Sequence, residues 1–210
     1  MTAFVVAVDG PAGSGKSSVC KEAARRLGFG YLDTGAGYRA MALHAKSHLH
    51  LDDAIASFEY EISLDPTNVQ VKLAGESVTE DIRSDEVAKL VSAIAREQAV
   101  RNQQREDARA RIASCDKPGI IVEGRDITTV VAPEAQVRIL LTASEEVRLS
   151  RRQKDQTEVA ENLVARDKSD SKVADFLVPA EGVALLDTTN LSFEESVLAL
   201  MKEIEEVRNV

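Results

Sequence analysis

A glycine-rich run at positions 10–17 is the segment of this chain with the clearest chemical meaning. It reads Gly-Pro-Ala-Gly-Ser-Gly-Lys-Ser and matches the complete pattern of a phosphate-binding loop, G-x4-G-K-[ST]. The glycines let successive main-chain N–H groups point at phosphate oxygens. Lys16 supplies a mobile charge to the β- and γ-phosphates, and the Ser17 hydroxyl can ligate Mg²⁺. The sequence therefore predicts a nucleoside triphosphate site.

Three further clusters of polar residues could bind the group that receives the phosphoryl. They are Asp-Thr-Gly-Ala-Gly-Tyr-Arg at 33–39, Glu-Gly-Arg-Asp at 123–126 and Arg-Asp-Lys-Ser-Asp at 166–170. The first two follow expected strands, and in an open α/β sheet the carboxyl ends of the strands line the ligand crevice. We therefore expect Arg39 and Arg125 to meet a second anion, the acceptor phosphate, beside the loop. An Asn-Lys-x-Asp guanine-reading motif does not occur, which weighs against a GTPase.

Short apolar runs alternate with helix-length segments along the chain, and the strands and helices that they predict must position these clusters. This alternation predicts a doubly wound α/β sheet whose strands are apolar throughout and buried on both faces. Capping-box pairs, Thr142 with Glu145 and Ser192 with Glu195, mark two helix starts. The expected strands are Phe4–Val8, Gly119–Val122, Val137–Leu141 and Val183–Leu186, with Tyr31–Leu32 as a weaker fifth, and the helices lie near 15–27, 36–49, 84–115, 143–168 and 193–208.

One segment departs from this alternation. Apolar and polar residues alternate over 58–64 and again over 69–73, and Asp-Pro-Thr-Asn at 65–68 separates the two stretches. This pattern is typical of an antiparallel hairpin. It predicts a small β insertion, roughly residues 58–80, on one edge of the α/β body.

Composition narrows the class of protein. The chain has 210 residues, 44% of them hydrophobic, and a formal charge of −9, which excludes bulk disorder and gives no footprint for nucleic acid or an anionic membrane. The longest apolar run is far below the ~20 residues that span a bilayer, and we expect no secretion signal. Two cysteines suit a reducing compartment. We expect a cytoplasmic, monomeric globular protein.

Several motifs in order resemble the bacterial cytidylate kinase family. They are D-T-G-A-x-Y-R, E-G-R-D-I-x-T-V-V-x-P and G-P-A-G-S-G-K-S-S, joined by Ile-Arg-Ser at 82–84 and Asp-Thr-Thr at 187–189. The resemblance implies an enzyme that moves the ATP γ-phosphoryl group onto CMP or dCMP, with Mg²⁺ as cofactor. It also implies a single-domain, three-layer P-loop fold with a five-stranded parallel sheet. The implied parts are a core of 1–48, 84–147 and 180–210, a small β-containing CMP-binding insertion at about 49–83 and a short helical lid at about 148–179.

The resemblance assigns roles to individual residues. ATP binding falls to Gly10, Pro11, Ala12, Gly13, Ser14, Gly15, Lys16, Ser17 and Ser18, with Ser17 as the metal ligand. Arg39 and Arg125 would hold the CMP phosphate, and Glu123 would position Mg²⁺ through water. Cytosine would meet Thr34, Ser92, Arg101 and Asp126, the ribose would meet Arg166 and Asp170, and catalysis would involve Lys16, Arg125, Arg152 and Arg166.

The chemistry of the base agrees with these roles. Cytosine presents an amine donor where uracil has a carbonyl acceptor, so the carboxylate of Asp126 favours cytosine and repels uracil. A general base is unnecessary, because a nucleotide phosphate with a second pKa near ~6 is already nucleophilic at neutral pH. Arg148, Arg151 and Arg152 share one helix face, and closing that segment over ATP would bring in cations and exclude water.

Four departures from the family pattern lead us to expect weakened or altered nucleotide affinity with activity retained. Thr128 replaces a usual glycine and could disturb a loop that needs positive φ. Gly37 replaces a usual Met or Ile, and the segment between Arg152 and Arg166 is short. Lys172 lies near the position where the family has an arginine that binds the base. A lysine cannot make the two parallel hydrogen bonds that an arginine makes.

Simpler structural interpretations remain open for each group. Arg39 and Arg125 could form structural ion pairs, Asp126 could cap a helix, Thr34 and Ser92 could be local caps, and the arginine face could be solvated.

Other functions also remain open. The Asp-Thr-Gly tripeptide at 33–35 occurs in aspartic proteases, and His44, His48 and His50 could suggest zinc, although no further ligand is near. Two further alternatives are a P-loop kinase that acts on another small acceptor and a nucleotide-binding module with a regulatory role.

Overall fold

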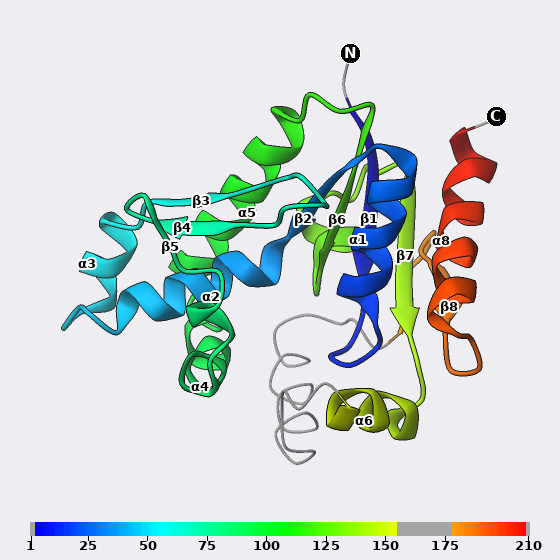
Figure 1. The fold of residues 1–210 in the computed structure, drawn as a ribbon. Helices are drawn as coiled ribbons and strands as arrows, with labels where there is room; N and C mark the ends of the chain where they lie inside the picture. Colours follow the sequence, from blue (N-terminus) through cyan, green and yellow to red (C-terminus); the bar gives the residue numbers. More distant parts are fainter. Residues whose placement is uncertain (1–2, 155–177, 209–210) are drawn as a thin grey trace.

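A five-stranded parallel sheet forms the centre of the protein in the computed structural model, which describes residues 3–154 and 178–208. The strand order is β2-β6-β1-β7-β8 (Figure 1). The five strands expected from the apolar runs are confirmed. Their bounds are β1 Phe4–Asp9, β2 Gly30–Asp33, β6 Gly119–Gly124, β7 Val137–Thr142 and β8 Ala184–Asp187.

Burial explains why the central strands are mostly apolar. In β1, Val6 and Val8 face one core cluster while Ala7 faces the other, and all three are fully buried. The expectation that the last strand is also buried on both faces is wrong, since Leu185 in β8 is 56% exposed. β8 pairs only with β7 among the described strands, so it has one neighbour where β1 has two.

Helices cover both faces of the sheet. α1 (Lys16–Leu27) and α8 (Phe193–Arg208) pack together on one face, and α2 (Thr34–Ala45), α5 (Gln98–Ala113) and the turn η2 (Ile127–Val131) pack on the other. The chain therefore has the three layers and doubly wound arrangement that the alternation predicts. No helix in the described part of the chain is both long and apolar enough to span a membrane.

The single helix expected over 84–115 is instead two helices, α4 (Asp85–Ile94) and α5. The residues between them, Ala95-Arg96-Glu97, all favour helices, so nothing in their types marks the turn. Packing forces the turn, because α4 buries Val87 and Val91 against α2 while α5 buries Ala108 in the core beside the sheet.

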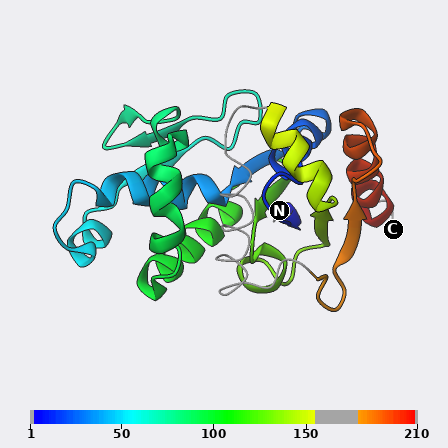
Figure 2. The same ribbon diagram turned by 90° about the horizontal axis from the view of Figure 1, so that it is seen from below.

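The predicted hairpin is confirmed as β3 (Tyr60–Ile62) and β4 (Val71–Leu73), which pair antiparallel with Ile62 opposite Val71. A third strand, β5 (Glu76–Ser77), extends it. α3 (Leu51–Ala56) precedes the hairpin and η1 (Asp81–Arg83) follows it. Seen from below, this small sheet lies with α2 and α4 at one end of the molecule, away from α8 (Figure 2).

Of the two predicted capping boxes, one is confirmed. The Ser192 hydroxyl accepts from the Glu195 amide at 3.2 Å, and the Glu195 carboxylate accepts from the Ser192 amide at 2.8 Å. The other is wrong: Ser144 accepts from the Val147 amide and caps α6 (Glu145–Lys154), because Thr142 is the last residue of β7. The remainder of the helix expected over 143–168 lies outside the described residues.

Candidate functional site

A cavity of about 900 Å³ opens where β1, β2 and β6 end. Parallel pairing sets Asp33 of β2 opposite Glu123 of β6, and Asp9 of β1 opposite Gly124 of β6. The glycine-rich loop therefore meets both polar clusters at one edge of the sheet. The sequence-predicted residues that line this cavity are Pro11, Ala12, Gly13, Gly15, Lys16, Ser17, Ser18, Thr34, Arg39, Ser92, Arg101, Glu123, Arg125, Asp126 and Arg151.

The loop has the backbone of an anion-binding turn. Gly13 and Gly15 have φ values of 76° and 87°, in the left-handed region that favours glycine, and Gly15 directly precedes α1. The positive end of α1 therefore faces the cavity. Gly10 and Ser14, two of the nine predicted loop residues, lie outside the lining, and Ser14 is buried with its hydroxyl unpartnered among the described residues.

Lys16 and two carboxylates form the charged floor of the cavity. The Lys16 ammonium forms an ion pair with Glu123, and Glu123 also accepts from the Tyr31 hydroxyl at 2.7 Å. Burial raises the pKa of Glu123, but the Lys16 charge and hydrogen bonds from Lys16, Ser17 and Tyr31 outweigh burial, so its pKa lies below the ordinary value. Burial and the neighbouring Glu123 charge raise the pKa of Asp33. The floor of the cavity therefore brings the carboxylates of Asp33 and Glu123 near the Lys16 ammonium.

Two arginines project into the same cavity from different strand ends. Arg39 lies one and a half turns into α2, and its Nη1 is 4.0 Å from Asp33, at the outer limit of an ion pair. The Arg125 guanidinium donates to the carbonyl oxygen of Gly10 at the start of the loop. The structure therefore brings both guanidinium groups beside the loop, and for Arg39 the alternative of a purely structural ion pair has only this long contact to support it.

Asp126 sits in a buried charge cluster at the end of β6. Its Oδ2 accepts from Arg101 Nη2 at 3.0 Å and from Arg105 Nη2 and Nε at 2.8 and 3.1 Å. The alternative that Asp126 caps a helix is wrong, because its side chain makes no cap hydrogen bond to η2. Sequence reasoning missed Arg105. The signal was present, since Arg105 lies four residues after Arg101 and therefore on the same helix face.

The remaining predicted base contacts also line the cavity. The Thr34 hydroxyl donates to the carbonyl oxygen of Glu123 at 2.8 Å, so it links α2 to β6 and does not act as a local cap. Ser92 lines the wall with α4 neighbours. Tyr38 was not predicted, yet it lines the cavity, and burial followed by the Asp126 charge raises its pKa to about 12.

The arginine face of α6 contacts the loop, and Arg151 also lines the cavity. Arg148 donates to the carbonyl of Ala12 at 3.0 Å, and Arg151 donates to the carbonyl of Ser14 at 2.8 Å. For these two residues the alternative of a solvated, salt-bridged face is wrong. The side chains of Arg152, Arg166, Asp170 and Lys172, and the predicted lid beyond α6, lie outside the described residues.

The expectation that Thr128 disturbs its loop is also wrong. Thr128 does not have positive φ, and both its amide and its hydroxyl donate to Asp9 Oδ2, at 2.8 and 2.6 Å. The Ile127 amide donates to the other oxygen of Asp9 at 2.8 Å. Burial raises the pKa of Asp9, and these bonds act against that rise. Thr128 therefore fastens η2 to the end of β1, directly before the loop.

The histidines give no support for zinc. His44 and His48 both contact the Ser57 hydroxyl at 3.1 Å near the end of α2. Among residues 3–154 and 178–208, no group of three or more His, Cys, Asp or Glu side chains could hold a metal ion. Cys20 is buried and Cys115 is partly buried, and both thiols are free, as expected for packing residues.

Comparison with known proteins gives consistent matches over nearly the whole chain. A family model described as cytidylate kinase matches residues 6–206. A protein named cytidylate kinase from Cutibacterium acnes is 42% identical over 94% of this chain and 94% of its own. One of the same name from Thermotoga maritima is 42% identical over 98% and 99%.

Solved structures support the fold alone. A gluconokinase from Sinorhizobium meliloti superposes with a TM-score of 0.56 at 15% identity, covering 99% of this chain and 94% of its own. TT1252 from Thermus thermophilus superposes with a TM-score of 0.51 at 18% identity, over 97% of this chain and 99% of its own.

Proposed function

This chain belongs to the cytidylate kinase family, and we propose on that basis that it transfers the γ-phosphoryl group of ATP to CMP and dCMP. The observation that carries the proposal is the shared cavity. The glycine-rich loop with Lys16 lines one part of it, Arg39 and Arg125 lie beside the loop, and the buried Asp126 cluster lines another part. Donor and acceptor phosphates can therefore meet in one space.

ATP binds at the loop in this proposal. Main-chain amides and the N-terminus of α1 hold the phosphates. Lys16 moves away from Glu123 and pairs with the negative charge of the triphosphate.

Mg²⁺ fits the residues present. The hydroxyl of Ser17 and the carboxylates of Asp33 and Glu123 are hard oxygen donors, which Mg²⁺ prefers, and it commonly takes few protein ligands beside phosphates and waters. When bound with ATP, the ion would neutralise charge on the β- and γ-phosphates. Ser17 would ligate it directly, and Glu123 would hold it through water.

Arg39 and Arg125 hold the acceptor phosphate. A guanidinium offers two parallel donors to a phosphate, so these residues can fix the orientation of the attacking oxygen as well as its charge. That oxygen is already deprotonated near neutral pH, so the protein needs to supply positioning and positive charge and not a base. Arg148 and Arg151 hold the loop carbonyls and thereby keep its amides turned toward the phosphates.

Asp126 recognises the base. All three guanidinium contacts to this carboxylate use Oδ2, which leaves Oδ1 to accept from the cytosine amine. Thr34, Ser92 and Arg101 complete the base pocket. Uracil would present a carbonyl oxygen to Oδ1, an unfavourable pairing worth ~1–3 kcal/mol.

We assign the remaining roles through the family resemblance. Arg166 and Asp170 would hold the ribose, and Arg152 and Arg166 would contribute charge to the transferring group. We also propose that the protein works as a monomer in the cytoplasm, which its two free cysteines support.

The test is a coupled ADP-release assay with CMP, dCMP, UMP, AMP and shikimate as acceptors. We expect CMP-dependent release, with CMP and dCMP well ahead of the other three. Release that is the same with and without CMP would reject the assignment, and faster release with UMP or shikimate would favour a kinase of another acceptor.

A further inference from the structure

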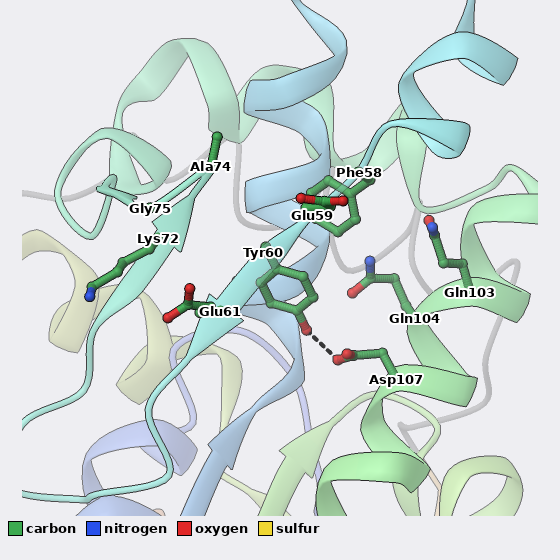
Figure 3. Close-up of a pocket in the computed structure, with 10 residues that line it drawn as sticks. All are labelled: Phe58, Glu59, Tyr60, Glu61, Lys72, Ala74, Gly75, Gln103, Gln104 and Asp107. Carbon is green, nitrogen blue, oxygen red and sulfur yellow. Dashed lines mark hydrogen bonds between the residues drawn. The ribbon is translucent and has the colours of Figure 1, made fainter.

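Carbonyl oxygens of the glycine-rich loop are held by side chains from three places: the end of β6, α6 and the position directly after β8. A second cavity, of about 410 Å³, lies apart from these contacts, between the hairpin and α5, where the Tyr60 hydroxyl donates to Asp107 (Figure 3). It shares no lining residue with the nucleotide cavity. The residues that orient the loop are therefore found at β6, α6 and the end of β8.

Arginine side chains hold every second carbonyl oxygen at the start of the loop. The three contacts are Arg125 to Gly10, Arg148 to Ala12 at 3.0 Å and Arg151 to Ser14 at 2.8 Å. No peptide bond in the described chain is cis, so a carbonyl oxygen and the N–H of the next residue point in opposite directions. Holding the carbonyls of Ala12 and Ser14 therefore turns the amides of Gly13 and Gly15 away from α6.

These two amides are available to a ligand. Neither the Gly13 nor the Gly15 N–H donates to an acceptor among the described residues, and both glycines line the nucleotide cavity. Main-chain N–H groups that are removed from water need a partner, and successive amides of such a loop suit phosphate oxygens. The orientation of each peptide plane therefore bears directly on how the loop binds a triphosphate.

Thr188, directly after β8, contacts both members of the hydrogen bond between Arg151 and Ser14. It is fully buried. Its hydroxyl accepts from Arg151 Nη1 at 3.2 Å, and its carbonyl accepts from Arg151 Nη2 at 2.9 Å. The same hydroxyl can donate to the carbonyl of Ser14 at 3.3 Å or to that of Thr142 at 2.9 Å. Both ends of the guanidinium are thereby fixed where one of them meets the loop.

Thr188 does not line the nucleotide cavity, so it can act on a bound nucleotide only through other residues. Arg151 does line it, and a Cβ atom at position 15 would lie 3.4 Å from Arg151 Nη1. The contacts of Thr188 concern the peptide plane between Ser14 and Gly15. The preceding plane, between Ala12 and Gly13, is held by Arg148.

We propose that Thr188 is a positioning residue for ATP, which through Arg151 holds the peptide between Ser14 and Gly15 so that the Gly15 N–H donates to a phosphate. This inference rests on the proposed function, because it requires a triphosphate in the loop. A guanidinium held at both nitrogens loses less freedom on meeting the Ser14 carbonyl than one held at a single point.

Thr188→Val tests the proposal by removing the hydroxyl while keeping a β-branched side chain. We expect KM for ATP to rise about fivefold, the scale of one hydrogen bond, with kcat and KM for CMP nearly unchanged. Thr188→Ser should restore the KM for ATP. Thr142→Val is the matched control, since Thr142 ends the neighbouring strand β7 and its hydroxyl has no partner among the described residues. It should leave all three constants unchanged.

Amide signals of Gly13 and Gly15 report on the two peptide planes separately. In the ¹⁵N-labelled full chain, saturating ADP with Mg²⁺ should shift both signals. In Thr188→Val the Gly15 shift should fall by about half while the Gly13 shift is kept, because Arg148 still holds the carbonyl of Ala12. Arg151→Lys, which keeps the charge but not the fork, should give the same split and serves if Thr188→Val fails a thermal melt.

The proposal is overturned if KM for ATP is unchanged in Thr188→Val, if KM for CMP rises equally, or if the Gly13 and Gly15 shifts fall together. Failure of the proposed function has a different signature, because the unaltered chain would then release no ADP in response to CMP. The ADP titration does not depend on the acceptor and still decides the role of Thr188 in that case.

Discussion

The two ends of the nucleotide cavity are built in different ways. The phosphate loop is nine consecutive residues, six between β1 and α1 and three in the first turn of α1, and its function depends mainly on backbone geometry. The base end takes Asp126 from the end of β6, Arg101 and Arg105 from α5, and Ser92 from α4. A contiguous site can be read from a local motif, whereas an assembled site depends on packing between distant segments.

Lys16→Ala tests the loop end and should have the largest effect. Loss of the charge that follows the transferring phosphoryl should lower kcat by about 10²–10³-fold, the scale of one lost electrostatic contact. Steady-state ADP release measures this. Lys21→Ala, an exposed lysine on the same helix, is the matched control and should retain full activity. Equal rates for the two variants would separate the loop from catalysis.

Asp126→Ala tests the base end. It removes the acceptor for the cytosine amine, so the preference for CMP over UMP in kcat/KM should fall by about 5- to 150-fold. The buried Arg101 and Arg105 lose their partner, so a thermal melt must show a folded variant. Asp116→Ala, an exposed change before β6, should keep the preference. An unchanged ratio in Asp126→Ala would remove this residue from base recognition.

Arg105→Lys sharpens the same comparison, because Arg105 reaches the base only through Asp126. Lysine keeps the charge but not the two donors that hold Oδ2. We expect KM for CMP to rise by about tenfold, equivalent to ~1.4 kcal/mol, with kcat and the KM for ATP nearly unchanged. A fall in kcat with constant KM would place Arg105 at the phosphoryl group and contradict the positioning role.

The smallest expected effect concerns Thr128, which supports the loop from outside the cavity. Thr128→Val removes the hydroxyl that donates to buried Asp9 and should destabilise the protein at pH 7 by ~1–2 kcal/mol in urea unfolding. Burial raises the pKa of Asp9 above its usual 3.8. Protonated Asp9 therefore favours the folded state at low pH, and this stabilisation is lost as pH rises through the folded pKa and Asp9 ionises. The destabilisation should therefore shrink as pH falls toward 3.8. Thr129→Val, at the exposed neighbouring position, should show no such pH dependence.

Features built from consecutive residues were predicted from the sequence, and features assembled from distant segments were missed. The five strands, the hairpin and the loop are local patterns of hydrophobicity and glycine, and the structure has them all. The turn between α4 and α5 was missed because Ala95, Arg96 and Glu97 are good helix formers and only tertiary packing separates the helices.

At the site, contacts between distant segments were the hardest to predict. Arg105 and Tyr38 were missed, and the expected harm from Thr128 was wrong because its partner, Asp9, lies far away in the sequence. Arg148 and Arg151 hold the loop carbonyls, a role that the sequence did not indicate, and Arg151 also lines the cavity. The closing of their segment over ATP stays a prediction. The roles assigned to 152, 166 and 170 remain predictions.

The central claim is that two anion pockets share one cavity, and a bisubstrate ligand tests it most directly. Adenosine and cytidine joined through five phosphates should bind at least tenfold more tightly than ATP or CMP alone in isothermal titration calorimetry, because the second contact becomes intramolecular. Lys16→Ala and Arg39→Ala should each remove most of that gain. Binding no tighter than ATP alone, or a gain that survives Arg39→Ala, would contradict a shared cavity for donor and acceptor.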